Sequence, residues 1–200
     1  MREDTRAARQ AQIEQAAYEV LEEKGYAATS MLAIARRARA SNETLYNWYG
    51  DKTGLFRALV VRNADAVRHM LEAALAQDAP PLSTLEALGP ELLALLTSSR
   101  AVQLNRAAAA DPTGDLGALL SERGRDAVAP LIGAVLERAR AAGLVDYETT
   151  GEAVGLYLDL LVGDLQIRRV IGRAPQPDEA AIAERARRAL DRFLVLMRPG

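Results

Sequence analysis

One short stretch of this 200-residue chain, from Ser30 to Lys52, concentrates side chains that suit recognition of nucleic acid. Amides, a carboxylate, a hydroxyl and two aromatic rings follow one another there: Asn42, Glu43, Thr44, Tyr46, Asn47 and Trp48. An amide can pair with adenine, a threonine can meet a base or a thymine methyl group, and a carboxylate can accept from cytosine N4. Such side chains on one face of a helix could read bases in the major groove of DNA.

Two short helices separated by a tight turn are predicted to position these side chains. The first is expected from about Met31 to Ala38, and the second from Ser41 to about Tyr49. In the second helix, Leu45 and Tyr49 lie four residues apart and therefore share one apolar face. The polar side chains are left on the outside, as in a helix-turn-helix whose second helix enters the major groove.

Hydroxyl groups precede both predicted helices. Thr29 or Ser30 can cap the first helix by accepting a backbone N–H, and Ser41 can cap the second. The hydroxyls of Thr29 and Ser30 could instead donate to a phosphate, although capping is the favoured role. A capped second helix would point its free N–H groups and its positive dipole end toward DNA.

The segment resembles the DNA-binding domain of TetR-type transcriptional regulators. That pattern combines a Thr, an Ile-Ala pair, a small-residue turn, a Ser, Thr-Leu-Tyr, an aromatic pair and a Lys in one register. The matching residues are Gly25, Tyr26, Thr29, Ile34, Ala35, Ala38, Ser41, Thr44, Leu45, Tyr46, Trp48, Tyr49, Lys52, Leu55 and Phe56. The resemblance implies that Thr44, Tyr46, Trp48 and Lys52 contact the DNA backbone. Packing within the small domain is the alternative for Tyr46 and Trp48.

Three residues depart from the family pattern. Arg39 stands where the family usually has a turn glycine, and a residue with a Cβ atom costs roughly 1–2 kcal/mol at positive φ. Either Arg39 carries that strain or the turn differs. Ala40 is smaller than the usual Val. Gly54 replaces a Glu, so a capping box with Asp51 is lost.

The net charge of −2 does not by itself indicate nucleic-acid binding. The charges are segregated, however. The acidic residues lie along a helix expected from about Thr5 to Lys24 (Glu14, Glu19, Glu22 and Glu23), while basic residues occupy the N-terminal arm and the turn. The basic residues are Arg2, Arg6, Arg9, Arg36, Arg37, Arg39 and Lys52. A local basic face can bind phosphate on an acidic protein. A merely solvated charged surface is the alternative.

Composition favours an all-α fold of about nine helices, since 50% of the residues are apolar and alternating β-branched runs are absent. We expect a three-helix DNA-binding domain at residues 1–50, with the helix-turn-helix at about 31–50. Residues 51–200 are expected to form a larger helical domain for ligand binding and dimerisation. A helix from Asp51 to about Gln77 would link the two.

The later helices are predicted from periodicity and caps. Ser83 and Glu86 form a capping-box pattern for a helix ending near Thr97. One helix is expected from Asp115 to Gly143, kinked or divided at Pro130. The last two, at about 147–171 and 178–197, read as a pair. Glycines 151, 155 and 163 would let another helix approach closely, and the resemblance implies a homodimer through a four-helix bundle. An internal helix hairpin is the alternative.

The sequence offers no catalytic constellation. His69 is the single histidine and cysteine is absent, so no metal cluster, disulfide or cofactor site is expected. No nucleophile elbow or phosphate loop is present. With no signal core and no apolar run near ~18 residues, we expect a cytoplasmic protein without membrane contact.

The resemblance also implies a pocket for a small-molecule effector in the larger domain. Candidate lining residues are His69, Met70, Leu104, Leu131 and Tyr157, each of which could equally be plain core. Few aromatic and many Ala and Leu residues favour an apolar effector. The expected protein is a repressor-type homodimer on a palindromic DNA operator, released by its effector. The alternative, motivated by Arg39, Ala40 and Gly54, is a helical ligand-binding or scaffold dimer that has lost DNA binding.

Overall fold

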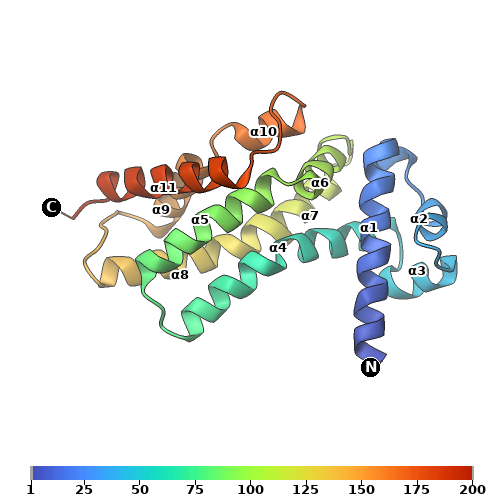
Figure 1. The fold of residues 1–200 in the computed structure, drawn as a ribbon, viewed down its shortest axis with the longest axis horizontal. Helices are drawn as coiled ribbons and strands as arrows, with labels where there is room; N and C mark the ends of the chain where they lie inside the picture. The colour runs from blue at the N-terminus through green and yellow to red at the C-terminus, as the bar shows by residue number, and fades with distance from the viewer. Residues whose placement is uncertain (1, 200) are drawn as a thin grey trace. The chain divides into compact units, whose positions relative to one another are not determined.

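The computed structural model describes residues 2–199 of the chain, and the side chains of residues 5–199. The side chain of Arg2 therefore lies outside the described residues. Residues 2–199 form helices and connecting turns without a β-strand, which confirms the predicted all-α class (Figure 1). None of the helices within this range is long and apolar enough to cross a membrane. The chain forms two compact units, Met1–Arg62 with Gln103–Arg123, and Asn63–Val102 with Gly124–Gly200.

Unit 1 contains the predicted helix-turn-helix. Its elements are α1 (Arg2–Ala28), α2 (Met31–Arg37), α3 (Asn42–Tyr49), the start of α4 (Lys52–Ala76), the end of α6 (Ser99–Ala109) and α7 (Asp115–Leu120). Apolar side chains at helical spacing form its core, among them Ile13, Ile34, Leu45 and Phe56. Leu104, Leu116 and Leu119 belong to this core as well, so the unit draws on two separate stretches of chain. The functional division at residue 50 stays a prediction.

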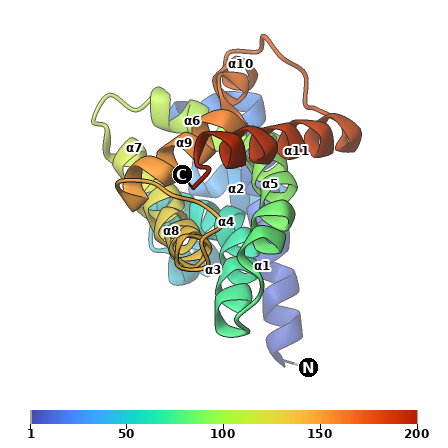
Figure 2. The same ribbon diagram turned by 90° about the vertical axis from the view of Figure 1, so that its left-hand side faces the viewer.

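Unit 2 is built around α5 (Pro81–Thr97). This helix contacts α8 (Asp126–Ala141), α9 (Thr150–Val162), α10 (Leu165–Val170) and α11 (Glu179–Leu196). Figure 2 shows α11 lying across α5, and α11 also packs on α9. Four leucines form the buried stripe of α5: Leu85, Leu88, Leu92 and Leu93. Their spacing of three and four residues places them on one helical face.

Several helix boundaries differ from the expected ones. Helix α5 begins at Pro81 rather than at Ser83, because proline suits the first turn of a helix. The expected 115–143 helix is interrupted by a π-helical segment, η1 (Ser121–Arg125), and Pro130 lies within α8. The helix is therefore divided upstream of Pro130 and not at the proline itself. The expected 147–171 helix ends at Gly163, which has a φ of 52°.

A close helix approach in unit 2 occurs at Gly89. A Cβ atom there would lie 3.0 Å from the Cβ of Ala186 and 3.4 Å from the hydroxyl of Tyr157. At Gly151 and Gly155 a Cβ atom would meet no described atom within 4 Å. Within one copy of the chain, it is therefore Gly89 that lets α5 and α11 come together.

Replacing Gly89 by Leu should lower the free energy of unfolding by about 1–3 kcal/mol or more, since overpacking forces neighbouring side chains and backbone to shift. Urea denaturation measures this change. Gly117→Ala is the matched control, because it lies in α7 with open space at the Cβ position and should stabilise by up to ~1 kcal/mol. Equal stabilities for Gly89→Leu and the wild type would contradict the close approach.

Candidate nucleic-acid interface

Serine hydroxyls cap both helices of the predicted helix-turn-helix. The Oγ of Ser30 accepts from the backbone N–H of Ala33 at 3.2 Å, and the Oγ of Ser41 accepts from that of Thr44 at 3.0 Å. Both capping predictions are confirmed. Thr29 has a different role, because its buried hydroxyl donates to the carbonyl of Gly25 at 2.7 Å.

Helix α3 has one buried and one exposed side. Leu45 is fully buried and holds the helix on the core of unit 1. The exposed side chains include Asn42, Glu43, Tyr46 and Asn47. Amides, an acid and a phenol therefore form the solvent face, with the capped N-terminus of the helix at one end. This is the arrangement that base reading from a groove requires.

The remaining side chains of α3 are half-buried. Thr44 turns its hydroxyl to that of Ser41, at 2.7 Å between the two oxygens. Trp48 packs within unit 1, and the guanidinium carbon of Arg6 lies 5.6 Å from the centre of its ring. Arg6 of α1 thus contacts α3. No local sequence signal indicated this contact.

The turn between α2 and α3 carries backbone strain at Arg39. This residue has a φ of 50°, in the left-handed region that favours glycine. Arg39 therefore carries the backbone strain itself, and the turn keeps the positive φ that usually calls for glycine. The Nη2 of Arg9 donates to the carbonyl of Arg39 at 2.5 Å and braces the turn from α1. The side chain of Arg39 itself is exposed.

A close backbone approach explains the glycine at position 54. A Cβ atom there would lie 1.9 Å from the carbonyl oxygen of Tyr49, at the end of α3. The Glu that the family usually has could not be accommodated in this conformation. Asp51 still caps α4, since the N–H of Gly54 donates to its Oδ1 at 2.7 Å. What is missing is the second hydrogen bond of a capping box, in which a side chain at position 54 would accept from the backbone N–H of Asp51.

Burial and ion pairs shape the electrostatics around the turn. Arg37 pairs with Glu23 at 2.7 Å and with Glu19 at 3.2 Å. The hydrogen bond to Glu23 makes the largest contribution to raising the pKa of Arg37, followed by the hydrogen bond to Glu19. The guanidinium of Arg37 in turn lowers the pKa of Glu23. Burial raises the pKa of Tyr49 to about 12, with a further contribution from the charge of Glu14. Both Arg36 and Arg39 are exposed.

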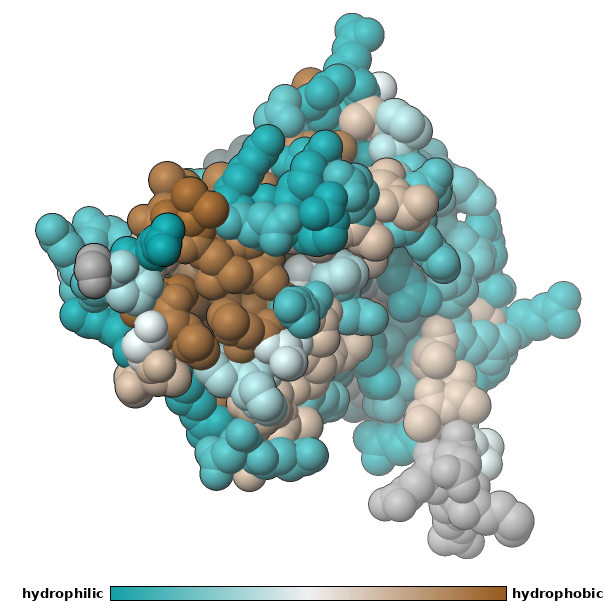
Figure 3. Space-filling view, turned by 60° about the vertical axis from the view of Figure 1, so that its left-hand side comes forward, coloured by the Kyte–Doolittle hydropathy of each residue, from teal (hydrophilic) through white to brown (hydrophobic). Residues whose placement is uncertain are grey.

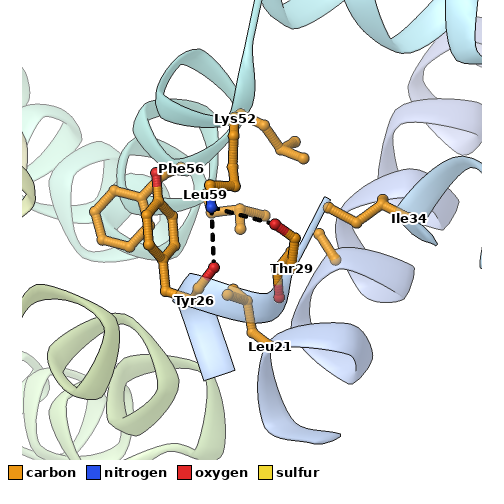
Figure 4. Close-up of a pocket in the computed structure, with 9 residues that line it drawn as sticks. Leu21, Tyr26, Thr29, Ile34, Lys52, Phe56 and Leu59 are labelled. Atoms are coloured by element: carbon orange, nitrogen blue, oxygen red, sulfur yellow. Dashed lines mark hydrogen bonds between the residues drawn. The ribbon is translucent and has the colours of Figure 1, made fainter. Parts of the chain in front are cut away.

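Lys52 points into unit 1 (Figure 4). Its Nζ donates to the carbonyls of Tyr26 at 3.0 Å and Thr29 at 3.2 Å. The same nitrogen lies 4.1 Å from the centre of the Tyr26 ring. Lys52 also helps to line a small hollow in unit 1. The apolar side chains around it are Ala17, Leu21, Ile34, Leu55, Phe56 and Leu59.

The predicted effector-pocket residues are distributed over both units. Leu104 lies in the core of unit 1, whereas Tyr157 lies in the core of unit 2 and donates to the carbonyl of Leu85 at 3.2 Å. Met70 and Leu131 pack against the core of unit 2. His69 is exposed, and its Nε2 lies 3.1 Å from the Nη2 of Arg68. The effector pocket stays a prediction.

Two family models match the chain. Residues 13–59 match the model described as bacterial regulatory proteins of the tetR family. Residues 83–197 match the C-terminal domain of AefR-like transcriptional repressors, which covers more than half of the chain. The chain belongs to the TetR family. A DNA-binding regulator fold is thereby established, as the resemblance implied. No curated protein matches the chain in sequence.

Solved structures of TetR-family regulators share this fold over nearly the whole chain. A regulator from Mesorhizobium loti has a TM-score of 0.78 at 24% identity, covering 96% of this chain and 98% of its own. A TetR regulator from Agrobacterium tumefaciens has a TM-score of 0.72 at 28% identity, covering 94% of both chains. The flavonoid-responsive regulator FrrA has a TM-score of 0.68 at 28% identity, covering 96% and 98%.

Relieving the strain at Arg39 should stabilise the protein. Arg39→Gly removes a penalty of roughly 1–2 kcal/mol and adds unfolded-state entropy worth about 0.4–1 kcal/mol, so we expect a net gain of about 0.5–1 kcal/mol. Arg39→Ala is the control, because it removes the same charge but keeps the Cβ atom. Chemical unfolding of both variants measures the difference. A Gly variant no more stable than the Ala variant would show that the turn is unstrained.

Proposed function

We propose that this TetR-family protein is a homodimeric repressor that binds a palindromic operator and is released by a small apolar effector. The observation that carries the proposal is the exposed polar face of α3, held by the buried Leu45 and capped by Ser41. Two such helices, one from each subunit, would enter successive major grooves about 34–36 Å apart.

The proposed contacts divide into base reading and backbone positioning. Asn42, Asn47 and Thr44 would read base edges, since amides and hydroxyls discriminate between base pairs in the major groove. The proposed backbone contacts are Ser30, Arg39, Ser41, Tyr46 and Trp48. Of these, Tyr46 is 49% exposed, which leaves its hydroxyl accessible to a phosphate. We assign no backbone contact to Thr29 or Lys52, because the buried Thr29 hydroxyl donates to Gly25 and the Nζ of Lys52 donates to two carbonyls of unit 1.

An apolar surface on unit 2 supports the proposed homodimer. Figure 3 shows apolar side chains gathered on the side of the molecule where α9 and α11 lie in Figure 1. On α11, Val195 is 74% and Leu196 is 61% exposed. On α10, Ile167 is 56% exposed. Apolar patches of this kind mark interfaces. We propose that the pair at about 147–171 and 178–197 forms a four-helix bundle with its copy.

The effector is proposed to bind within unit 2. Apolar side chains dominate its core, and Met70, Leu131 and Tyr157 belong to that core or pack against it. A binding site among such residues would favour an apolar molecule. The similar regulator FrrA is flavonoid-responsive, which supports a small-molecule effector for the present chain. Effector binding would release DNA through differential affinity for two conformational states.

Substitutions on α3 should separate base reading from backbone contact. Asn47→Ala should change base preference at one operator position by about 1–3 kcal/mol. Tyr46→Phe should weaken binding to every sequence by a similar factor, since a phosphate contact carries no sequence information. Titration of a panel of operator variants, starting from the DNA upstream of the gene, measures both. If wild-type protein forms no salt-sensitive, sequence-selective complex, a dimer without DNA binding becomes the better description.

A charge placed in the apolar patch should dissociate the homodimer. Val195→Glu would bury a carboxylate in the proposed interface, and such burial without a partner is costly. Analytical ultracentrifugation should show a monomer with unchanged helical content by circular dichroism. Leu32→Glu, at an apolar position of α2 that is 48% exposed, is the control and should remain dimeric. A dimeric Val195→Glu variant would place the interface elsewhere.

A further inference from the structure

The ammonium group of Lys52 is engaged inside unit 1. Its two carbonyl acceptors, Tyr26 and Thr29, lie at 3.0 and 3.2 Å, and the Tyr26 ring lies beneath it at 4.1 Å. The ring is itself fixed by an edge-on contact with Phe56, at 5.8 Å between the two ring centres. Figure 4 shows the Lys52 side chain directed toward these groups, between α4 and the end of α1.

The two carbonyls belong to a break in the helical hydrogen bonding. Gly25, just before Tyr26, has a φ of 71° and interrupts α1. Thr29 directly precedes Ser30, the cap of α2. The carbonyl of Tyr26 also accepts from the backbone N–H of Thr29 at 3.1 Å. The last carbonyls of a helix generally lack intrahelical partners, and a cation is a favourable donor for them. Lys52 thus joins the first residue of α4 to the junction between α1 and α2.

We infer that Lys52 is a positioning residue that sets the orientation of the helix-turn-helix, and that the exposed Arg36 and Arg39 supply the phosphate contacts near the turn. This inference rests on the proposed DNA binding. A lysine that donates to two carbonyls and covers a ring would have to give up these contacts to reach a phosphate. Neither Arg36 nor Arg39 has a side-chain ion pair among the described residues, whereas Arg37 has two.

The inference assigns different duties to cations that are close in sequence. Arg37 holds α2 on α1 through Glu19 and Glu23, and Lys52 holds α4 on the α1–α2 junction. Arg36 and Arg39 remain in solvent on α2 and in the turn. Each cation that neutralises a phosphate releases counterions. Of these four cations, only Arg36 and Arg39 should therefore contribute to the salt dependence of DNA binding.

Salt titration of operator binding by Lys52→Met and Arg36→Met tests the assignment. Both substitutions remove one charge and keep an unbranched stem. For Lys52→Met we expect operator affinity to fall at every salt concentration, with the wild-type slope of log K against log[salt]. For Arg36→Met the slope should decrease by about 0.9, the value for one lost phosphate contact. Each protein is first shown to be folded at the assay temperature.

Unfolding of the same proteins without DNA provides the second measurement. Hydrogen bonds to a charged donor contribute enough that Lys52→Met should raise the equilibrium constant for unfolding by about tenfold or more. Arg36→Met should leave that constant almost unchanged, as exposed substitutions usually do. If Lys52→Met does not fold, Lys52→Gln, which keeps an N–H donor without the charge, replaces it in both measurements.

Two results would overturn the inference. A slope that decreases for Lys52→Met as it does for Arg36→Met would make Lys52 a phosphate contact. An unchanged operator affinity for the folded Lys52 variant would reduce its role to stability alone. A wild-type protein that binds no operator would instead refute the proposed function. In that case an unchanged unfolding constant for Lys52→Met would still refute the internal role of Lys52.

Discussion

Satisfying the backbone groups at helix ends is the constraint on which unit 1 depends. Helices α2 and α3 have 7 and 8 residues, and isolated helices shorter than about 12–15 residues are marginal in water. Most of their N–H and C=O groups lie in a first or last turn, where intrahelical partners are missing. Serine caps, the Arg9 contact to the turn and the Lys52 contact to the α1–α2 junction supply these partners. Buried side chains such as Leu45 then fix the helices on a common core.

The use of cationic side chains for contacts within unit 1 also limits which charges are available to DNA. A cation used to satisfy a carbonyl or an internal carboxylate cannot neutralise a phosphate at no cost. Arg37 is paired with two carboxylates and Lys52 donates to two carbonyls, whereas Arg36 and Arg39 have no side-chain ion pair among the described residues. The strain at Arg39 fits this division, because an arginine at a position favouring glycine retains a charge beside α3. Net charge alone could not reveal such a distribution.

Unit 2 follows a different principle, since its helices are joined mainly by apolar contact. The leucine stripe of α5 faces α8, α9 and α11, and Gly89 removes the side chain that would keep α11 away. Apolar side chains of α10 and α11 remain exposed among the described residues. Covering that surface with a second copy would also bring two α3 helices into one assembly, which a palindromic operator requires.

The sequence by itself determined the helical class, the register of the helix-turn-helix, the Ser41 cap and the family, because these follow from local spacing and side-chain chemistry. It left the cap of α2 open between Thr29 and Ser30, and the structure decided for Ser30. Tertiary structure decided the positive φ of Arg39, the need for glycine at positions 54 and 89, and the partners of Arg6, Arg9 and Lys52. It also decided that Leu104 joins the core of unit 1. These features depend on residues far apart in the chain meeting in space, and periodicity within one helix carries no information about which distant atoms it will meet.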